Sequence, residues 1–291
     1  MVKLHKASIV IPIYNEIQSV KQEVETLFKY EWLSDFELIL VDDGSEDGTS
    51  DVLTALEKEY DFILVKHEKN QGYGAALKSG IEKASRDHII ITDCDDSYPN
   101  DRIPDMLKQY TEKKLDMLVG SRDGNSDAIP TIRKPVKLFF NKLASYLAKR
   151  KIPDLNSGLR VFRKDVVMKY KEYLCDGFSF TSTITLIMFC NSYKVDYTPI
   201  DYYHRGGKSK IKPVRDTLNF LYLVTSTVFY FRPLRILLPI SGTMVLAAMM
   251  LLLNDLVQYQ SVRTSTGIVF QTGVLTFFMA FIADLLVKKD L

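Results

Sequence analysis

Hydrophobic and polar positions repeat with two different periods along the first 111 residues. Short apolar runs predict buried strands, and the stretches between them carry apolar residues at helical spacing. The predicted strands are 8–14, 36–41, 62–67 and 88–92, and the predicted helices are 17–30, 49–60, 75–84 and 103–111. This alternation indicates βαβ units and an α/β fold with a mostly parallel central sheet.

The pattern changes after about residue 210, where the chain turns apolar. Residues 236–253 and 264–283 contain no charged side chain, and ~20 such residues are enough for a helix to cross a bilayer. A pair of buried core helices is the alternative. The expected organisation is a soluble domain over 1–210, an interfacial amphipathic region over 211–232, and a part over 233–291 with two transmembrane helices at about 234–254 and 264–287.

Basic residues flank the two apolar segments on their outer sides. Arg232 and Arg235 precede the first segment and Lys288 and Lys289 follow the second, whereas the connecting loop 254–263 carries one basic residue. Positively charged flanks stay on the cytoplasmic side of a membrane. We therefore expect an integral protein of the cytoplasmic membrane, with the large domain and both chain ends in the cytoplasm.

Composition excludes some classes of function. The formal net charge of the 291 residues is +2, which gives no electrostatic reason to expect a nucleic-acid partner. The three cysteines are scattered and odd in number, so neither a disulfide framework nor a cysteine metal site is expected. The short apolar run near the N-terminus is broken by Pro12 and predicts a strand, not a signal peptide.

Polar residues follow the first, second and fourth predicted strands, at 14–16, 42–45 and 93–96. In parallel sheets ligands bind beyond the carboxyl ends of the strands, so these residues should converge on one crevice. The stretch VDDGSEDGTSD at 41–51 looks like a calcium loop, but a strand precedes it and Thr54 stands where an EF-hand has its bidentate Glu. Turn and helix-start chemistry is expected for Asp47, Gly48 and Thr49.

Asp93 and Asp95 form a better candidate for a metal site. They stand two residues apart at the end of a strand, so both carboxylates can point to the same side. Carboxylate oxygens suit Mg²⁺ or Mn²⁺, which often share their ligands with substrate phosphates. A solvated acidic turn is the alternative.

Six segments together resemble the family-two glycosyltransferases with a GT-A fold, a Rossmann-like nucleotide-sugar transferase domain. They are IPIYNE (11–16), VDDGSEDGT (41–49), NQGYGAALKSG (70–80), TDCDDSYP (92–99), GSR (120–122) and DLNSGLRVFRK (154–164). With RGGKSK (205–210), the chain is most similar to the polyprenyl- and dolichyl-phosphate hexose synthases. Order and spacing agree over about the first 210 residues, which makes the set specific although each motif alone is weak.

The resemblance implies a binding site for a nucleotide sugar. Pro12, Tyr14 and Glu16 would line the nucleotide pocket, Asp42 would accept a hydrogen bond from the base, and Asp43 would lie beside it. Further donor contacts would come from Asn70, Gly72, Lys78, Asp93, Cys94 and Asp95. Packing over the sheet edge is the alternative for Tyr14, and a solvated helix lysine is the alternative for Lys78.

The resemblance also assigns the metal and the acceptor. Asp93 and Asp95 would bind Mg²⁺ or Mn²⁺ as the DxD pair, with Ser97 as a candidate third ligand where several family members carry Gln, and with Asp96 as another candidate. Arg122 and Arg133 would hold the acceptor phosphate. Asp154, Asn156 and Ser157 would contact sugar or acceptor, and Arg205 and Lys208 would close over the diphosphate. Surface charge is the alternative for each basic residue alone.

The implied activity is inverting transfer of a hexose from a nucleotide sugar to a polyprenyl or dolichyl phosphate. UDP-glucose is the favoured donor and GDP-mannose another. A phosphate monoester has its second pKa at ~6 and is already a nucleophile at pH 7. No general base is then required, in keeping with only four His residues and no obvious Ser-His-Asp set. The basic stretch 134–151 would lie in the membrane interface or pack on the core, and homo-oligomers are a further expectation.

Three other functions compete with this one. A processive polysaccharide synthase normally carries a QxxRW segment, and Trp32, the only tryptophan, stands elsewhere. A glycosyltransferase acting on a glycerolipid or a diphosphate-linked glycolipid is a closer alternative. A non-catalytic membrane scaffold is disfavoured by the presence of Asp93, Asp95, Arg122 and Arg205.

Overall fold

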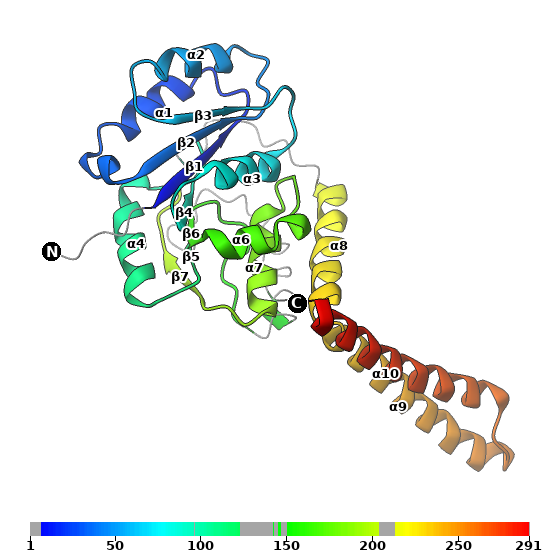
Figure 1. Cartoon of the computed structure of the whole chain (residues 1–291). Coiled ribbons are helices and arrows are strands. Elements are labelled where there is room, and N and C mark those ends of the chain that lie inside the picture. The colour runs from blue at the N-terminus through cyan, green and yellow to red at the C-terminus, as the bar shows by residue number, and fades with distance from the viewer. Residues whose placement is uncertain are drawn as a thin grey trace.

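The computed structural model describes residues 7–95, 97–122, 142, 145–146, 150–203 and 213–290, with no side-chain description for 213–220 and 290. This part of the chain forms an α/β unit from which a helical arm extends (Figure 1). The strands are β1 (Ser8–Ile13), β2 (Glu37–Asp42), β3 (Ile63–Lys66), β4 (His88–Ile91), β5 (Met117–Ser121), β6 (Arg160–Arg163) and β7 (Val195–Pro199). The α-helices are α1 (Val20–Leu27), α2 (Thr49–Leu56), α3 (Tyr73–Lys83), α4 (Ile103–Glu112), α6 (Lys164–Lys169), α7 (Phe180–Cys190), α8 (Pro213–Phe231), α9 (Leu234–Tyr259) and α10 (Thr264–Asp290). The short 3₁₀ helices are η1 (Glu31–Asp35), η2 (Asn100–Arg102) and η5 (Lys171–Tyr173).

The seven strands form one sheet in the order β3-β2-β1-β4-β6-β5-β7. The pairs β1–β2, β1–β4, β2–β3 and β5–β7 are parallel, whereas β6 runs antiparallel to both of its neighbours. The sheet is therefore mostly parallel, as predicted. The loops that leave β1, β2, β3 and β4 consequently emerge at the same edge.

Alternate strand residues face opposite sides of the sheet, and each side has its own core. Val10 and Ile39 pack on one side with α3, α6, α7 and α8. Ile9 and Leu40 pack on the other side with α1, α2 and α4. Helices thus cover both faces (Figure 1), which explains why the strands read as continuous apolar runs.

Gly80 lets α3 lie close to the sheet. A Cβ at this position would come within 2.4 Å of Val10 Cγ1 and 2.9 Å of Val41 Cγ2. Both neighbours are fully buried β-branched side chains, so they have little freedom to move away.

Replacing Gly80 with Ala should therefore destabilise the protein, although alanine is the better helix former. Overpacking of this kind costs about 1–3 kcal/mol of the free energy of unfolding. Thermal unfolding of the detergent-solubilised variant measures the effect. Lys83→Ala, at an exposed position in the last turn of α3, is the control for a change in helix propensity. A melting temperature unchanged by Gly80→Ala would contradict the close packing of α3.

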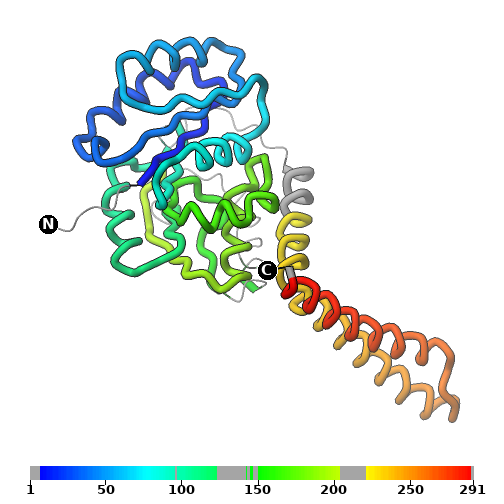
Figure 2. The backbone as a smooth tube through the Cα atoms, viewed as in Figure 1, coloured from blue at the N-terminus to red at the C-terminus, as the bar shows by residue number. Residues whose placement is uncertain are grey.

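The helical arm consists of α9 and α10, which run antiparallel to each other (Figure 2). Both helices are long and apolar enough to cross a membrane, and only 11% of the most apolar window of each is buried. This exposure excludes the alternative interpretation of the two segments as buried core helices. The helix α8 joins the arm to the rest, since Val224, Val228 and Phe231 belong to the core shared with α7.

Five strands and α-helices of the α/β unit had no bounds predicted from the sequence, namely β5, β6, α6, α7 and β7. The three strands among them complete the sheet, and β6 is its antiparallel member. The basic stretch 134–151 falls almost entirely outside the described residues, so its predicted interfacial helix remains a prediction. The proposed division at residues 210 and 232 also remains a prediction.

Candidate active site

The loops after β1 and β2 are joined by hydrogen bonds. Asn15 is in the left-handed region with φ 55°, its backbone N–H donates to Ser45 Oγ at 3.0 Å, and its side-chain oxygen accepts from the backbone N–H of Glu46 at 2.9 Å. The backbone N–H of Glu16 donates to Thr49 Oγ1 at 3.0 Å. These bonds hold two of the predicted ligand-binding loops side by side.

The acidic stretch after β2 begins a helix, as predicted for its later residues. Asp47 Oδ1 accepts from the backbone N–H of Thr49 at 3.0 Å and from its hydroxyl at 2.6 Å. Asp47 Oδ2 accepts from the backbone N–H of Ile17 at 3.1 Å. These are turn and helix-start contacts. They account for the Asp47-Gly48-Thr49 pattern that resembles part of a calcium loop.

Asp42 and Asp43 are both buried but make different contacts. Asp42 Oδ1 accepts from the backbone N–H of Ser45 at 3.0 Å. Asp43 Oδ1 accepts from the N–H of Gln71 at 2.9 Å and Oδ2 from that of Gly72 at 2.8 Å, and Oδ1 lies 2.6 Å from His67 Nδ1. Asp42 thus keeps more of its carboxylate for a ligand, whereas both oxygens of Asp43 hold the loop after β3. Contact of either residue with a nucleotide stays a prediction.

Asp93, after β4, is held by a tyrosine hydroxyl. Tyr73 Oη donates to Asp93 Oδ1 at 2.9 Å, and the Tyr73 ring stacks on the exposed Phe178 with centroids 5.7 Å apart. Burial and the nearby Asp93 raise the pKa of the Tyr73 hydroxyl well above its usual range, so it remains a donor at physiological pH. Sequence reasoning did not include Tyr73, because no spacing rule connects positions 73 and 93.

Asp95 lies two residues on and is bonded within its own turn. Its Oδ1 accepts from the backbone N–H of Ser97 at 3.1 Å and from the Ser97 hydroxyl. Ser97 is buried, and its carbonyl accepts from the backbone N–H of Tyr203 at 3.1 Å. Ser97 therefore orients Asp95, whether or not its hydroxyl also binds a metal.

Arg122, after β5, is fixed by the buried Asp154. Arg122 Nε and Nη2 donate to Asp154 Oδ2 and Oδ1 at 2.6 and 2.9 Å, a bidentate pair. Burial alone would lower the pKa of the guanidinium, but the hydrogen bonds to Asp154 raise it above its usual value. The guanidinium also lies over the Tyr202 ring, 5.2 Å from its centroid. The observed contacts make Asp154 the group that orients Arg122, and its contact with sugar or acceptor stays a prediction.

The segment that follows Asp154 lies against Asp93. A Cβ on Gly158 would come within 2.8 Å of Asp93 Oδ2, so only glycine leaves room for that carboxylate. The backbone N–H of Gly158 donates to Tyr98 Oη at 2.7 Å. Asn156 is exposed and its side-chain oxygen accepts from the Ser182 hydroxyl. Ser157 Oγ is buried and has no hydrogen-bond partner among the described residues.

Arg160 supports this segment from beneath and was not predicted as a site residue. It is fully buried; its Nη2 donates to the carbonyl of Ser157, and its Nη1 donates to the carbonyl of Thr181 and to Thr185 Oγ1, both at 2.9 Å. Burial lowers the pKa of its guanidinium. Arg160 thus ties the 155–157 backbone to α7, and no sequence signal separates it from the neighbouring surface-type Arg163.

The remaining predicted residues are more scattered. Tyr14 is exposed and Pro12 and Glu16 are half-buried at the end of β1, Asn70 is exposed, and Cys94 packs in the core beside α4. Lys78 Nζ lies 2.8 Å from Asp176 Oδ1, within a hollow of about 370 Å³. Arg133, Arg205 and Lys208 lie outside the described residues.

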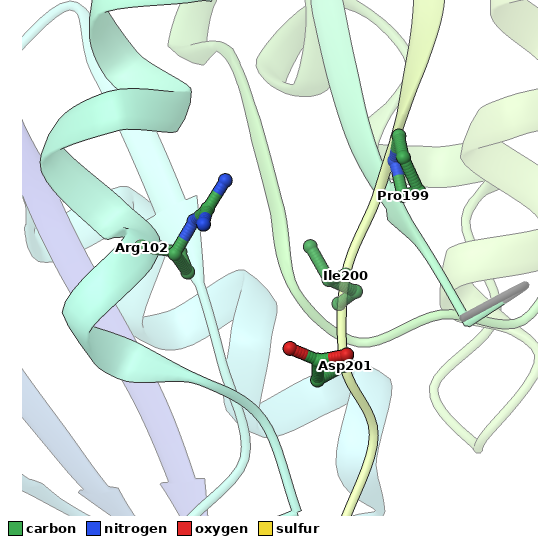
Figure 3. Close-up of a pocket in the computed structure, with 4 residues that line it drawn as sticks. All are labelled: Arg102, Pro199, Ile200 and Asp201. Atoms are coloured by element: carbon green, nitrogen blue, oxygen red, sulfur yellow. The ribbon is translucent and has the colours of Figure 1, made fainter. Parts of the chain in front are cut away.

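A smaller cavity of about 100 Å³ lies between η2 and the end of β7 (Figure 3). It is lined by Arg102, Pro199, Ile200 and Asp201. None of these residues belongs to the predicted site.

The donor groups of Asp93 and Asp95 fit a hard divalent cation. Both are carboxylates, and Mg²⁺ commonly binds through one or two protein carboxylates while keeping waters and substrate phosphates as its other ligands. Within the described residues no cluster of three or more His, Cys, Asp or Glu side chains is arranged to hold a metal ion. The pair therefore fits a metal that is completed by a bound diphosphate, and not a closed structural site.

Comparisons with known proteins bear on the segments that form this site. Residues 8–171 match the family described as Glycosyl transferase family 2. A dolichyl-phosphate hexose transferase of Haloferax volcanii is 26% identical over 209 residues, which cover 71% of this chain and 86% of that protein. An undecaprenyl-phosphate 4-deoxy-4-formamido-L-arabinose transferase of Photorhabdus laumondii is 32% identical over 169 residues, or 57% of this chain. The chain spans about half the length of the second relative, of which 51% is covered.

Solved structures show the same fold. Glucosyl-3-phosphoglycerate synthase from Mycobacterium tuberculosis, crystallised with Mn²⁺, UDP and phosphoglyceric acid, has a TM-score of 0.59 at 16% identity, covering 77% of this chain and 78% of that one. TarS 1–349 from S. aureus with UDP-GlcNAc has a TM-score of 0.58 at 16% identity, covering 94% and 81%. With the family match spanning more than half of the sequence and every described loop of the site up to Arg160, the chain belongs to Glycosyl transferase family 2 and is a glycosyltransferase with the GT-A fold.

Proposed function

We propose that this glycosyltransferase transfers a hexose from a nucleotide sugar, UDP-glucose in the first instance, to a polyprenyl or dolichyl phosphate with inversion at the anomeric carbon. One observation carries the proposal: the same chain contains the candidate site and two helices that are long enough to cross a membrane, and α8 packs on the core and connects the two parts. The Haloferax and Photorhabdus relatives carry names of transferases acting on lipid phosphates. The basic flanks of the helical arm favour a cytoplasmic location for both chain ends and the catalytic part.

The proposed donor site uses the loops after β1 to β4. Asp42 accepts from the base, and the 70–72 backbone lies beside the nucleotide. Asp93 and Asp95 hold Mg²⁺ or Mn²⁺, which when bound neutralises the diphosphate that leaves. The two solved structures described above contain UDP or UDP-GlcNAc, and that of glucosyl-3-phosphoglycerate synthase also contains Mn²⁺, in line with this arrangement.

The proposed acceptor site centres on Arg122. Its bidentate bond to Asp154 uses Nε and Nη2, which leaves Nη1 to donate to an acceptor phosphate. The acceptor is ionised at pH 7, so its oxygen attacks the anomeric carbon while the bond to the leaving diphosphate breaks, and no proton needs to be removed. The task of the protein is to orient two anionic partners in line.

The test incubates membranes containing the protein with labelled UDP-glucose, GDP-mannose or other UDP-hexoses, polyprenyl phosphate and Mg²⁺ or Mn²⁺. A labelled lipid that is cleaved by mild acid and requires the lipid monophosphate is expected, and EDTA should abolish its formation. Membranes with Asp95→Ala are the matched control. A labelled glycerolipid, formed without lipid monophosphate, would replace the proposal with the alternative acceptor class. No labelled lipid from any donor would refute both.

A further inference from the structure

A buried histidine lies behind the candidate nucleotide loop. His67 directly follows β3, and its side chain is 7% exposed. Its Nδ1 lies 2.6 Å from Asp43 Oδ1 and its Nε2 lies 2.9 Å from Ser79 Oγ on α3. Because a carboxylate only accepts, Nδ1 carries the proton and donates it to Asp43. In the neutral ring Nε2 then accepts from the Ser79 hydroxyl.

Asp43, which is held by His67, in turn holds the loop that follows β3. Its two oxygens accept from the consecutive backbone N–H groups of Gln71 and Gly72. Gly72 has φ 106°, a region that favours glycine, and a Cβ there would come within 2.6 Å of the Asp176 carbonyl. The loop lies outside the sheet ladder, since β3 ends at Lys66. Its backbone shape therefore depends on the Asp43 carboxylate.

The loop held by Asp43 is connected to Asp93, the proposed metal-binding carboxylate, through Tyr73. Tyr73 follows Gly72 directly, opens α3 and donates to Asp93. A continuous series of contacts thus runs from Ser79 through His67 and Asp43 to the 71–72 amides, and from there along the chain to Tyr73 and Asp93. Both the nucleotide end and the diphosphate end of the proposed donor site lie on this path.

The Asp43–His67–Ser79 arrangement has the order of a hydrolytic triad, but its location does not suit that chemistry. Ser79 is in the interior of α3, where backbone N–H groups are used by the helix itself. The N–H groups next to this hydroxyl are therefore engaged in the helix and are not offered to an oxyanion. The arrangement is better suited to holding Asp43 still.

We propose that His67 is a positioning residue for the donor nucleotide: by fixing Asp43, it keeps the Gln71–Gly72 amides in the conformation that receives the nucleoside diphosphate. The inference rests on the proposed function for its effect on turnover. Its structural part concerns only the loop and can be measured without any donor. The described contacts of the His67 ring are with Asp43 and Ser79, apart from the residues proposed for the metal and the acceptor.

The experiment compares three full-length variants in detergent or nanodiscs. His67→Leu removes both ring nitrogens, His67→Asn restores a donor near the Nδ1 position, and His67→Gln places its amide near the Nε2 position instead. Hydrogen–deuterium exchange is followed for the peptide that contains Gln71 and Gly72, without donor. Then KM for the nucleotide sugar and kcat are measured separately, with Ser79→Ala as the control at the far end of the series.

His67→Leu should speed exchange of these two amides about 10- to 100-fold and raise the donor KM by a similar factor, with kcat changed much less, because supporting partners of this kind are worth about that much. His67→Asn should recover most of both effects. His67→Gln, which loses the contact with Asp43, should behave like His67→Leu, whereas Ser79→Ala, which keeps that contact, should not. If His67→Leu does not fold, the Asn and Gln variants supply the same comparison.

Unchanged exchange in the Leu and Gln variants, or an Asn variant no better than Gln, would overturn the positioning role. Faster exchange that is rescued by Asn, in a protein that transfers no sugar from any donor, would leave the role in place and refute the proposed function. A fall in kcat with an unaltered KM would also overturn the inference, since it would place His67 in the chemical step.

Discussion

Replacing Asp93 with Asn should lower sugar transfer by about 10²–10³-fold while the protein remains folded. The amide keeps an oxygen that can accept from Tyr73, whose hydroxyl lies 2.9 Å from Asp93 Oδ1, so the local packing is preserved. What is lost is the negative charge that the proposed metal site needs. Initial rates with the labelled donor, measured over a range of Mn²⁺ concentrations, report the change.

Tyr73→Phe is the matched control for this substitution. It removes only the hydroxyl and leaves the ring to stack on Phe178, so a loss of about tenfold or less is expected for one supporting hydrogen bond. Wild-type rates for Asp93→Asn at every metal concentration would rule out a metal-binding role for this carboxylate. Equal losses in both variants would indicate that Tyr73, not charge, is what matters at Asp93.

Arg122→Met should both destabilise the protein and abolish transfer. Asp154 is fully buried and would lose both of its hydrogen bonds from the Arg122 side chain. Breaking a buried ion pair from one side costs about 3–5 kcal/mol of the free energy of unfolding. Denaturant unfolding of the solubilised protein gives this quantity, and the transfer assay gives the activity.

The double variant Arg122→Met with Asp154→Leu separates the two effects. Removing both charges should restore part of the stability, since an apolar pair leaves no buried carboxylate unpaired. Recovery should be incomplete because Asp154 also accepts from the backbone N–H groups of Arg122 and Asn156. Activity should stay absent if Arg122 binds the acceptor phosphate. Active double-variant enzyme would show that the pair is only structural.

The first half of the fold could be read from the sequence because its signals are local. The strands and helices up to α4 lie within a few residues of their predicted bounds, since apolar runs and helical spacing alternate regularly there. β6, with the sequence RVFR, begins and ends in arginine, a pattern that does not predict a buried strand. Its first arginine, Arg160, is buried because carbonyls of the 155–157 segment and of α7 accept hydrogen bonds from its guanidinium. α7 is buried on all sides, so it shows no helical periodicity.

The candidate site also contains residues that the sequence predicted and contacts that it did not. Carboxylates directly after strands were found because the parallel sheet brings strand ends together. The contacts of Tyr73 with Asp93 and of His67 with Asp43 join residues 20 and 24 positions apart, and no spacing rule predicts such contacts. The sequence also suggested no Ser-His-Asp set, whereas in the folded chain His67 contacts both Asp43 and Ser79.

The packing of α8 on α7 has a mechanical consequence. The helix ends three residues before α9 begins, Arg232 Nε donates to the carbonyl of Cys190 at the end of α7, and Tyr230 Oη donates to Tyr173 Oη at 2.9 Å. A helix advances about 100° per residue around its axis. The direction in which the arm leaves the catalytic part therefore depends on the residue at which α8 ends, and α8 acts as a rigid strut between them. In the proposed arrangement, with the arm in a bilayer, such a strut would fix the height of the sheet edge above the lipid, and the head group of the proposed lipid acceptor would have to rise to that height.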